Sequence, residues 1–214
     1  MIKSLPNILT LGRLVLTVVF LLMILYSPQV ERQALFLDVA FVLFVVAGVT
    51  DVVDGHVARR FDATSKFGRI IDPLVDKVLV CGTFTCFAVI GVPALFGWGA
   101  GTLAVIHWSV VVILFSREAY VTVLRHVAEA KGVNFAATKS GKFKMLTQVF
   151  AIGTVLIKTA HVPDAAWGDW FTAAIFALMV AATIVSGFLA TRRPSWKQFK
   201  KEEAGTHEPS TAST

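Results

Sequence analysis

Six apolar stretches divide this chain of 214 residues, and each is close to the roughly 20 residues that a helix needs to cross a bilayer. They cover residues 8–26, 34–53, 73–92, 102–115 (with a continuation past Arg117), 143–157 and 170–189. Hydrophobic residues make up 56% of the chain and charged residues only 16%, a balance typical of integral membrane proteins. We therefore expect an all-α integral membrane protein with six transmembrane helices.

The basic residues predict how these helices are oriented. If both termini are cytoplasmic, all of the 20 lysines and arginines except Arg32 and Lys158 fall in cytoplasmic segments or at cytoplasmic helix ends. The sequence pI of about 9.6 follows from these basic residues, and anionic lipid headgroups suffice as their partners, so the charge requires no nucleic acid.

The pattern indicates one domain, residues 1–190, followed by a basic and then polar tail, residues 191–214, which we expect to be disordered. Residues 1–10 predict a short amphipathic lead-in. The first apolar stretch is too long for a signal peptide and is interpreted as a retained helix. Residues 54–66 predict a polar connector of about a dozen residues between the second and third spans.

Four carboxylates interrupt this apolar pattern: Asp51, Asp54, Asp72 and Asp76. Spacings of three and four residues place each pair on one helix face, and two antiparallel helices would bring the pairs together. Unpaired carboxylates would repel one another, and hard divalent cations relieve that repulsion. Two such ions are suited to clamp a pyrophosphate, so the acids predict a two-metal site. The alternative is a set of structural ion pairs with Arg59, Arg69 or Lys77.

Small residues, hydroxyls and one guanidinium lie between the acid pairs: Gly55, Ala58, Arg59, Thr64, Ser65 and Gly68. Gly55 and Gly68 leave room for a phosphate or nucleotide to approach the backbone. Arg59 offers a fork of donors for phosphate oxygens. The whole segment therefore favours chemistry at a phosphate group.

The residues fit the pattern D-x2-D-G-x2-A-R-x8-G-x3-D-x3-D at every specified position, from Asp51 to Asp76. This pattern resembles the signature of the CDP-alcohol phosphatidyltransferases. Residues 5–13, LPNILTLGR, are similar to the N-terminal segment of that family. Residues 72–77, DPLVDK, and residues 116–144 resemble the branch that uses sn-glycerol 3-phosphate, with Val75 where alanine is usual. The similarity covers roughly residues 3–190.

The resemblance implies a six-helix membrane enzyme, commonly a homodimer, that binds two divalent cations, Mg²⁺ or Mn²⁺. It implies that the four acids are the metal ligands and that Asp76 is also the general base. Gly55, Arg59 and Ser65 match positions that hold the cytidine diphosphate of the lipid donor, and Ala58, Thr64 and Gly68 lie beside them. It further implies a bacterial inner membrane location, with the active site facing the cytoplasm.

The implied reaction transfers the phosphatidyl group of CDP-diacylglycerol to sn-glycerol 3-phosphate, giving phosphatidylglycerol phosphate and CMP. The acceptor carries its own phosphate and needs a separate cationic pocket. Charge and placement make Arg117, Arg125, Lys139 and Lys142 the candidate residues for that pocket.

Several alternatives remain open. The same chemistry could use another acceptor, such as inositol phosphate, serine or phosphatidylglycerol. An intramembrane prenyltransferase also uses aspartate pairs with magnesium, although the Gly-x2-Ala-Arg element is then unexplained. A transporter or cation channel could use the acids as a binding site, and it would release no CMP from a CDP-linked lipid.

Four other residues are interpreted as structural. Asp38, in the second apolar stretch, is expected at an interface or in the bundle, and His107 is expected as a hydrogen-bonded core histidine. Cys81 and Cys86 are expected to be buried thiols without a disulfide.

Overall fold

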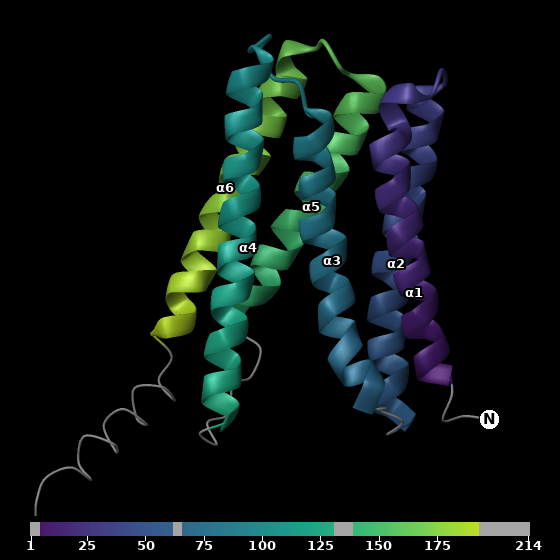
Figure 1. The fold of residues 1–214 in the computed structure, drawn as a ribbon, viewed down its shortest axis with the longest axis vertical. Helices are drawn as coiled ribbons and strands as arrows, with labels where there is room; N and C mark the ends of the chain where they lie inside the picture. The colour runs from purple at the N-terminus through teal and green to yellow at the C-terminus, as the bar shows by residue number, and fades with distance from the viewer. Residues whose placement is uncertain (1–4, 62–65, 131–138, 193–214) are drawn as a thin grey trace, which may run out of the picture.

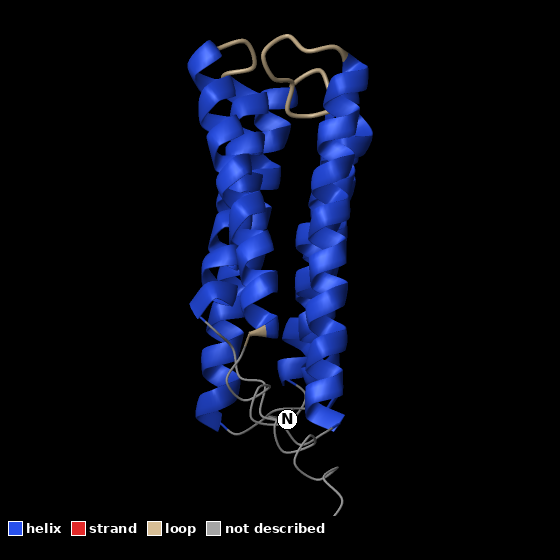
Figure 2. Cartoon of the chain, turned by 90° about the vertical axis from the view of Figure 1, so that its left-hand side faces the viewer, coloured by secondary structure: helices blue, strands red, loops and turns tan. Residues whose placement is uncertain are grey.

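The computed structural model describes the backbone of residues 5–61, 66–130 and 139–192, and the side chains of residues 11–50, 74–130 and 140–192. The described chain is helical apart from short connections (Figure 2). Six long helices are present in these ranges: α1 (Leu5–Tyr26), α2 (Gln33–Phe61), α3 (Lys66–Ile90), α4 (Ala100–Ala130), α5 (Lys139–His161) and α6 (Ala166–Thr191). A single turn of 3-10 helix, η2 (Ser27–Gln29), joins α1 to α2.

The helices form a closed ring. Around it, α1 packs on α3, α3 on α4, α4 on α6, α6 on α5, α5 on α2, and α2 on α1 (Figure 1). The first residue of α1 and the last residue of α6 lie at the same end of the bundle (Figure 1). We call this the terminal end, and the other the loop end.

Five of these helices are long and apolar enough to cross a membrane: α1, α2, α4, α5 and α6. The third is not among the five, and its first half carries the charged residues of the acidic motif. The expectation of an all-helical membrane protein is therefore confirmed.

The sequence expectation was wrong about two boundaries. Residues 5–26 form one continuous helix, so the lead-in is not a separate element after Leu5. Helix α2 continues through the predicted connector to Phe61, and α3 begins at Lys66. Polar side chains do not end a helix where no glycine turn or proline intervenes. The acids therefore lie within helices, several residues away from the helix ends.

The interior of the ring is mainly apolar toward the loop end, although His107, Lys158 and Thr172 are buried polar residues there, and it is more polar toward the terminal end. The apolar part is a continuous core that includes Phe20, Phe44, Phe84, Leu114, Ile152 and Met179. The polar part includes Arg13, Thr17, Lys144, Thr147, Gln148 and Ser186, all buried.

A buried ion pair joins α5 to α6 at the loop end. Lys158 is one of the two basic residues that the predicted orientation does not place on the cytoplasmic side. It is 3% exposed, and its Nζ lies 2.9 Å from a carboxylate oxygen of Asp169. Asp169 also accepts the backbone N–H of Phe96, at 2.9 Å, which ties the α3–α4 connection to α6. Lys158 is therefore paired within the protein and does not contradict the predicted orientation.

The remaining structural expectations have mixed outcomes. Asp38 pairs with His161 at 2.8 Å, which joins α2 to α5 as an interface residue. Cys81 and Cys86 are both buried and free, as expected. His107 is buried in the core, as expected; the Pro93 backbone is its nearest hydrogen-bonding group, although neither ring nitrogen makes a hydrogen bond of good geometry within the described part of the chain.

Candidate active site

The backbone places the four acids on two helices at one end of the bundle. Asp51 and Asp54 lie on α2, while Asp72 and Asp76 lie on α3. The two helices run in opposite directions, and their terminal ends are joined through residues 62–65 (Figure 1). A connection of this length spans at most roughly 18 Å. The antiparallel arrangement that the sequence predicted is confirmed for the helices, whereas the side chains of Asp51, Asp54 and Asp72 lie outside the described residues.

Asp76 is the acid whose side chain is described, and it contacts the first helix. Its carboxylate lies 3.1 Å from the Arg13 guanidinium. The Arg13 side chain is 3% exposed and the Asp76 side chain is 39% exposed. Arg13 thus fixes the carboxylate from the interior while leaving it accessible on another side. This contact connects the N-terminal segment to the acidic motif, two regions that the sequence could relate only by resemblance.

A group of partly buried charges, with Lys144 fully buried, continues from Asp76 across the ring. The next residue, Lys77, donates to the Thr122 hydroxyl of α4 at 2.6 Å. Thr122 in turn donates to the backbone carbonyl of Glu118, at 2.6 Å. The Glu118 carboxylate forms ion pairs with Arg117, at 3.0 Å, and with Lys144 of α5. We call Lys77, Arg117, Glu118 and Lys144 the basic cluster.

Helix α6 completes the surroundings of the basic cluster. The Arg117 Nε–H donates to the Ser186 hydroxyl at 3.2 Å. The neighbouring Gly187 leaves the space that the Arg117 side chain occupies, since a Cβ there would lie 3.4 Å from Arg117 Cγ. The cluster therefore connects α3, α4, α5 and α6 at one level of the bundle.

The basic cluster carries more positive than negative charge. It contains three basic side chains and one carboxylate: Glu118 pairs with Arg117 and Lys144, whereas Lys77 contacts the Thr122 hydroxyl. Lys144 is 8% exposed, and Arg117 and Glu118 are 14% and 16% exposed in their side chains. Excess charge in such surroundings is costly unless a counter-ion is present. The arrangement is therefore suited to bind an anion with about two negative charges, such as a phosphate monoester.

The predicted acceptor residues have different positions in the structure. Arg117 belongs to the basic cluster, whereas Arg125 and Lys142 are exposed to the outside of the bundle. The side chain of Lys139 lies outside the described residues. The prediction that Arg125, Lys139 and Lys142 bind the acceptor stays untested.

Sequence reasoning missed Lys77, Glu118 and Lys144. A signal for Lys144 was available, because it lies at helical spacing from the buried positions Gln148, Ala151 and Val155. The exposed Lys142 does not lie on that buried face of α5. Helical periodicity, considered together with charge, would therefore have predicted Lys144 and not Lys142 as the buried cation.

Most of the predicted contacts with the CDP group fall where side chains are not described. The backbone places Gly55, Ala58 and Arg59 on α2 and Gly68 on α3. Thr64 and Ser65 lie in the connection outside the described residues. These residues stay predictions, and the helices place four of them within two turns of a predicted metal ligand.

The donor set at this end fits hard divalent cations. Carboxylate oxygens are the ligands that Mg²⁺ and Mn²⁺ prefer, and the Asp76 carboxylate is accessible rather than enclosed. Within the described residues no group of three or more histidine, cysteine, aspartate or glutamate side chains forms an alternative metal site. Three of the four predicted ligands are outside that set.

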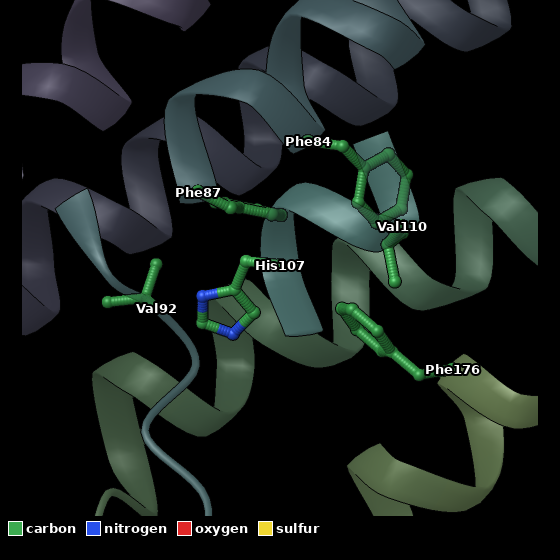
Figure 3. Close-up of a pocket in the computed structure, with 6 residues that line it drawn as sticks. All are labelled: Phe84, Phe87, Val92, His107, Val110 and Phe176. Atoms are coloured by element: carbon green, nitrogen blue, oxygen red, sulfur yellow. The ribbon is translucent and has the colours of Figure 1, made fainter. Parts of the chain in front are cut away.

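A narrow pocket toward the loop end is separate from these charges. It is lined by Phe84, Phe87, Val92, His107, Val110 and Phe176 (Figure 3). The imidazole of His107 points into it between aromatic rings (Figure 3). A single neutral imidazole in apolar surroundings offers neither charge nor a second ligand, so this pocket is unsuited to phosphate chemistry.

Comparison with known proteins decides the family. Residues 3–189 match the sequence profile of the CDP-alcohol phosphatidyltransferases. The chain belongs to this family. It is therefore a transferase, and the resemblance of the acidic motif is confirmed.

Two relatives show the similarity in detail. The chain is 32% identical over 209 residues to the CDP-diacylglycerol--glycerol-3-phosphate 3-phosphatidyltransferase of Bacillus subtilis, covering 92% of this chain and 94% of that protein. It is 35% identical over 156 residues to a probable phosphatidylglycerophosphate synthase of Mycobacterium tuberculosis, covering 73% of this chain and 67% of that protein.

Gly187 provides a test of the position of Arg117. Gly187→Ala should retain phosphatidyltransferase activity, because its Cβ makes an ordinary contact with Arg117 Cγ at 3.4 Å. Gly187→Leu should displace Arg117 from Ser186 and Glu118 and lower kcat/KM about tenfold or more. Gly101→Leu is the control, since Gly101 faces open space at the loop end. Full activity of Gly187→Leu would contradict a role for the position of Arg117.

Proposed function

We propose that this protein transfers the phosphatidyl group of CDP-diacylglycerol to sn-glycerol 3-phosphate, with release of CMP and formation of phosphatidylglycerol phosphate. The observation that carries the proposal is the placement of a four-acid motif on two antiparallel helices beside a partly buried basic cluster. The acids suit a pyrophosphate donor, and the cluster suits a phosphorylated acceptor. The names of the two relatives agree with both halves of this assignment.

The donor is proposed to bind at the acids. Asp51, Asp54, Asp72 and Asp76 would hold two divalent cations, Mg²⁺ or Mn²⁺, and such ions neutralise developing charge on a pyrophosphate when bound. Arg59 would donate to phosphate oxygens of the CDP group. Gly55 and Gly68 would let the nucleotide approach the helix backbone closely, with Ala58, Thr64 and Ser65 beside it.

Asp76 is proposed as the general base. The acceptor hydroxyl gives its proton to the Asp76 carboxylate while its oxygen attacks the phosphorus of the phosphatidyl group. The bond between that phosphorus and the bridging oxygen breaks, and CMP leaves with the electron pair. Arg13 would hold the carboxylate in place during this exchange, because its guanidinium lies 3.1 Å away and is buried.

The acceptor phosphate is proposed to bind at Arg117 and Lys144, with Lys77 nearby. Its two negative charges would balance the two excess positive charges of the basic cluster. Glu118 would hold Arg117 and Lys144 beside each other, because its carboxylate contacts both. The exposed residues Arg125 and Lys142 are suited to attract the anion from solution but not to enclose it.

The distribution of basic residues predicts which side of the membrane the site faces. We infer that the terminal end faces the cytoplasm of a bacterium and that the protein lies in its inner membrane, since the basic residues gather there. The lipid donor would enter from the bilayer and glycerol 3-phosphate from water. A homodimer is proposed by resemblance to the family.

A panel of acceptors tests the function. Purified protein with Mg²⁺ or Mn²⁺ and CDP-diacylglycerol should release CMP with glycerol 3-phosphate, and it should release little with inositol phosphate, serine or phosphatidylglycerol. Chelation of the metal should abolish release. CMP release with inositol phosphate alone would mean that the proposed acceptor is wrong, while transfer from CDP-diacylglycerol would still be supported. No release with any acceptor would contradict the proposed function.

Asp76→Asn tests the base. The variant should fold and bind the donor, yet kcat should fall at least about 100-fold, because Asn cannot accept the proton. Asp38→Asn is the matched control, since Asp38 pairs with His161 at the loop end and should retain turnover. Binding of CDP-diacylglycerol and CMP release would be measured for both. Near-normal turnover of Asp76→Asn would remove the base assignment.

A further inference from the structure

The side chain of Gln148 is buried in the polar part of the bundle without a hydrogen-bond partner. It is 1% exposed, and neither its Oε1 nor its Nε2 bonds to any described residue. A buried amide that makes none of its hydrogen bonds lowers the stability of the fold, so native proteins rarely retain one without a ligand or water beside it. An apolar residue would pack there at lower cost.

Gln148 lies one helical turn from the basic cluster. Lys144 and Gln148 are four residues apart on the buried face of α5, so their side chains are neighbours. Gln148 is the deeper of the two, toward the apolar core. A molecule whose phosphate binds at Lys144 and Arg117 would therefore extend its carbon chain toward Gln148.

A second helix shows the same arrangement. Thr17 lies one turn deeper than Arg13 on α1, is 0% exposed, and has no partner for its hydroxyl among the described residues. Two unsatisfied polar groups thus occur directly behind the charged layer, each on the helix of a buried cation. The ring provides polar groups for a ligand at this depth and not only charge.

We propose that the amide of Gln148 binds the non-reacting hydroxyl of the acceptor and gives the site its specificity for a polyol phosphate. In glycerol 3-phosphate this is the hydroxyl on the middle carbon. The rise of one helical turn, about 5.4 Å, is comparable with the distance between that hydroxyl and the phosphate. This inference rests on the proposed function and identifies a contact of the same acceptor site.

An acceptor that lacks the middle hydroxyl, 3-hydroxypropyl phosphate, tests the contact. The wild-type enzyme should prefer glycerol 3-phosphate by about 10- to 100-fold in kcat/KM. The analogue has no middle hydroxyl, so the Gln148 amide stays without a hydrogen-bond partner when the analogue binds. Gln148→Met, which keeps the length but not the amide, should lose about that factor with glycerol 3-phosphate. With the analogue it should change less than about threefold.

Stability provides an independent readout. If the amide is unsatisfied in the free enzyme, Gln148→Met should unfold at the same temperature as wild type or higher. Thr154→Val is the matched control on α5, since its hydroxyl already bonds to the Phe150 carbonyl at 2.8 Å, and it should not change acceptor preference.

Each outcome decides between the possibilities. Loss of preference in Gln148→Met with unimpaired stability supports the proposal. An equal loss with both acceptors, an unchanged preference, or a destabilised or misfolded Gln148→Met protein would overturn it, because the amide would then have a structural role or bind water only. Absence of CMP release by the wild type with either acceptor would instead contradict the proposed function.

Discussion

Charge inside an apolar bundle must be neutralised, and the arrangement of this protein follows from that constraint. A helix pair carrying four carboxylates could not remain in a bilayer without cations close by. Arg13 supplies one, at 3.1 Å from Asp76. Lys77, the residue after Asp76, contacts Thr122, and Arg117 and Lys144 pair with the nearby Glu118. Acids and bases thus lie at one level of the ring and at one end of the membrane helices.

The division of the interior explains how such a site can function beside lipid. The apolar core around Phe20, Phe84 and Met179 closes the ring toward the loop end. At that end Lys158 and Asp169 are paired with each other, so their charges contribute nothing to the site. The unsatisfied amide of Gln148 and the excess positive charge of the basic cluster lie in the half that contains the acids. Substrates with phosphate groups are therefore directed to one side of the protein.

Much of the fold could be predicted from the sequence because apolar length and charge asymmetry act over whole helices. The limits of α2 and α3 could not, since polar residues 54–61 are compatible with either a loop or the end of a helix. The acids could be predicted because each pair lies three or four residues apart, and that spacing places the two side chains on one helix face without any knowledge of the packing. The basic cluster was missed because it combines α3, α4 and α5, and such proximity is set by the packing of the ring. Lys144 and Lys142 differ in burial, not in charge, and only the helical face distinguishes them.

The acceptor phosphate is proposed to bind in the basic cluster, next to metal held by the acids. Paramagnetic relaxation of the ³¹P resonance of glycerol 3-phosphate by protein-bound Mn²⁺ measures this proximity directly. We predict strong relaxation in the wild type, which Lys144→Gln abolishes and Lys142→Gln, at an exposed position of the same helix, retains. Absence of relaxation in the wild type, or its loss in Lys142→Gln with retention in Lys144→Gln, would contradict the claim.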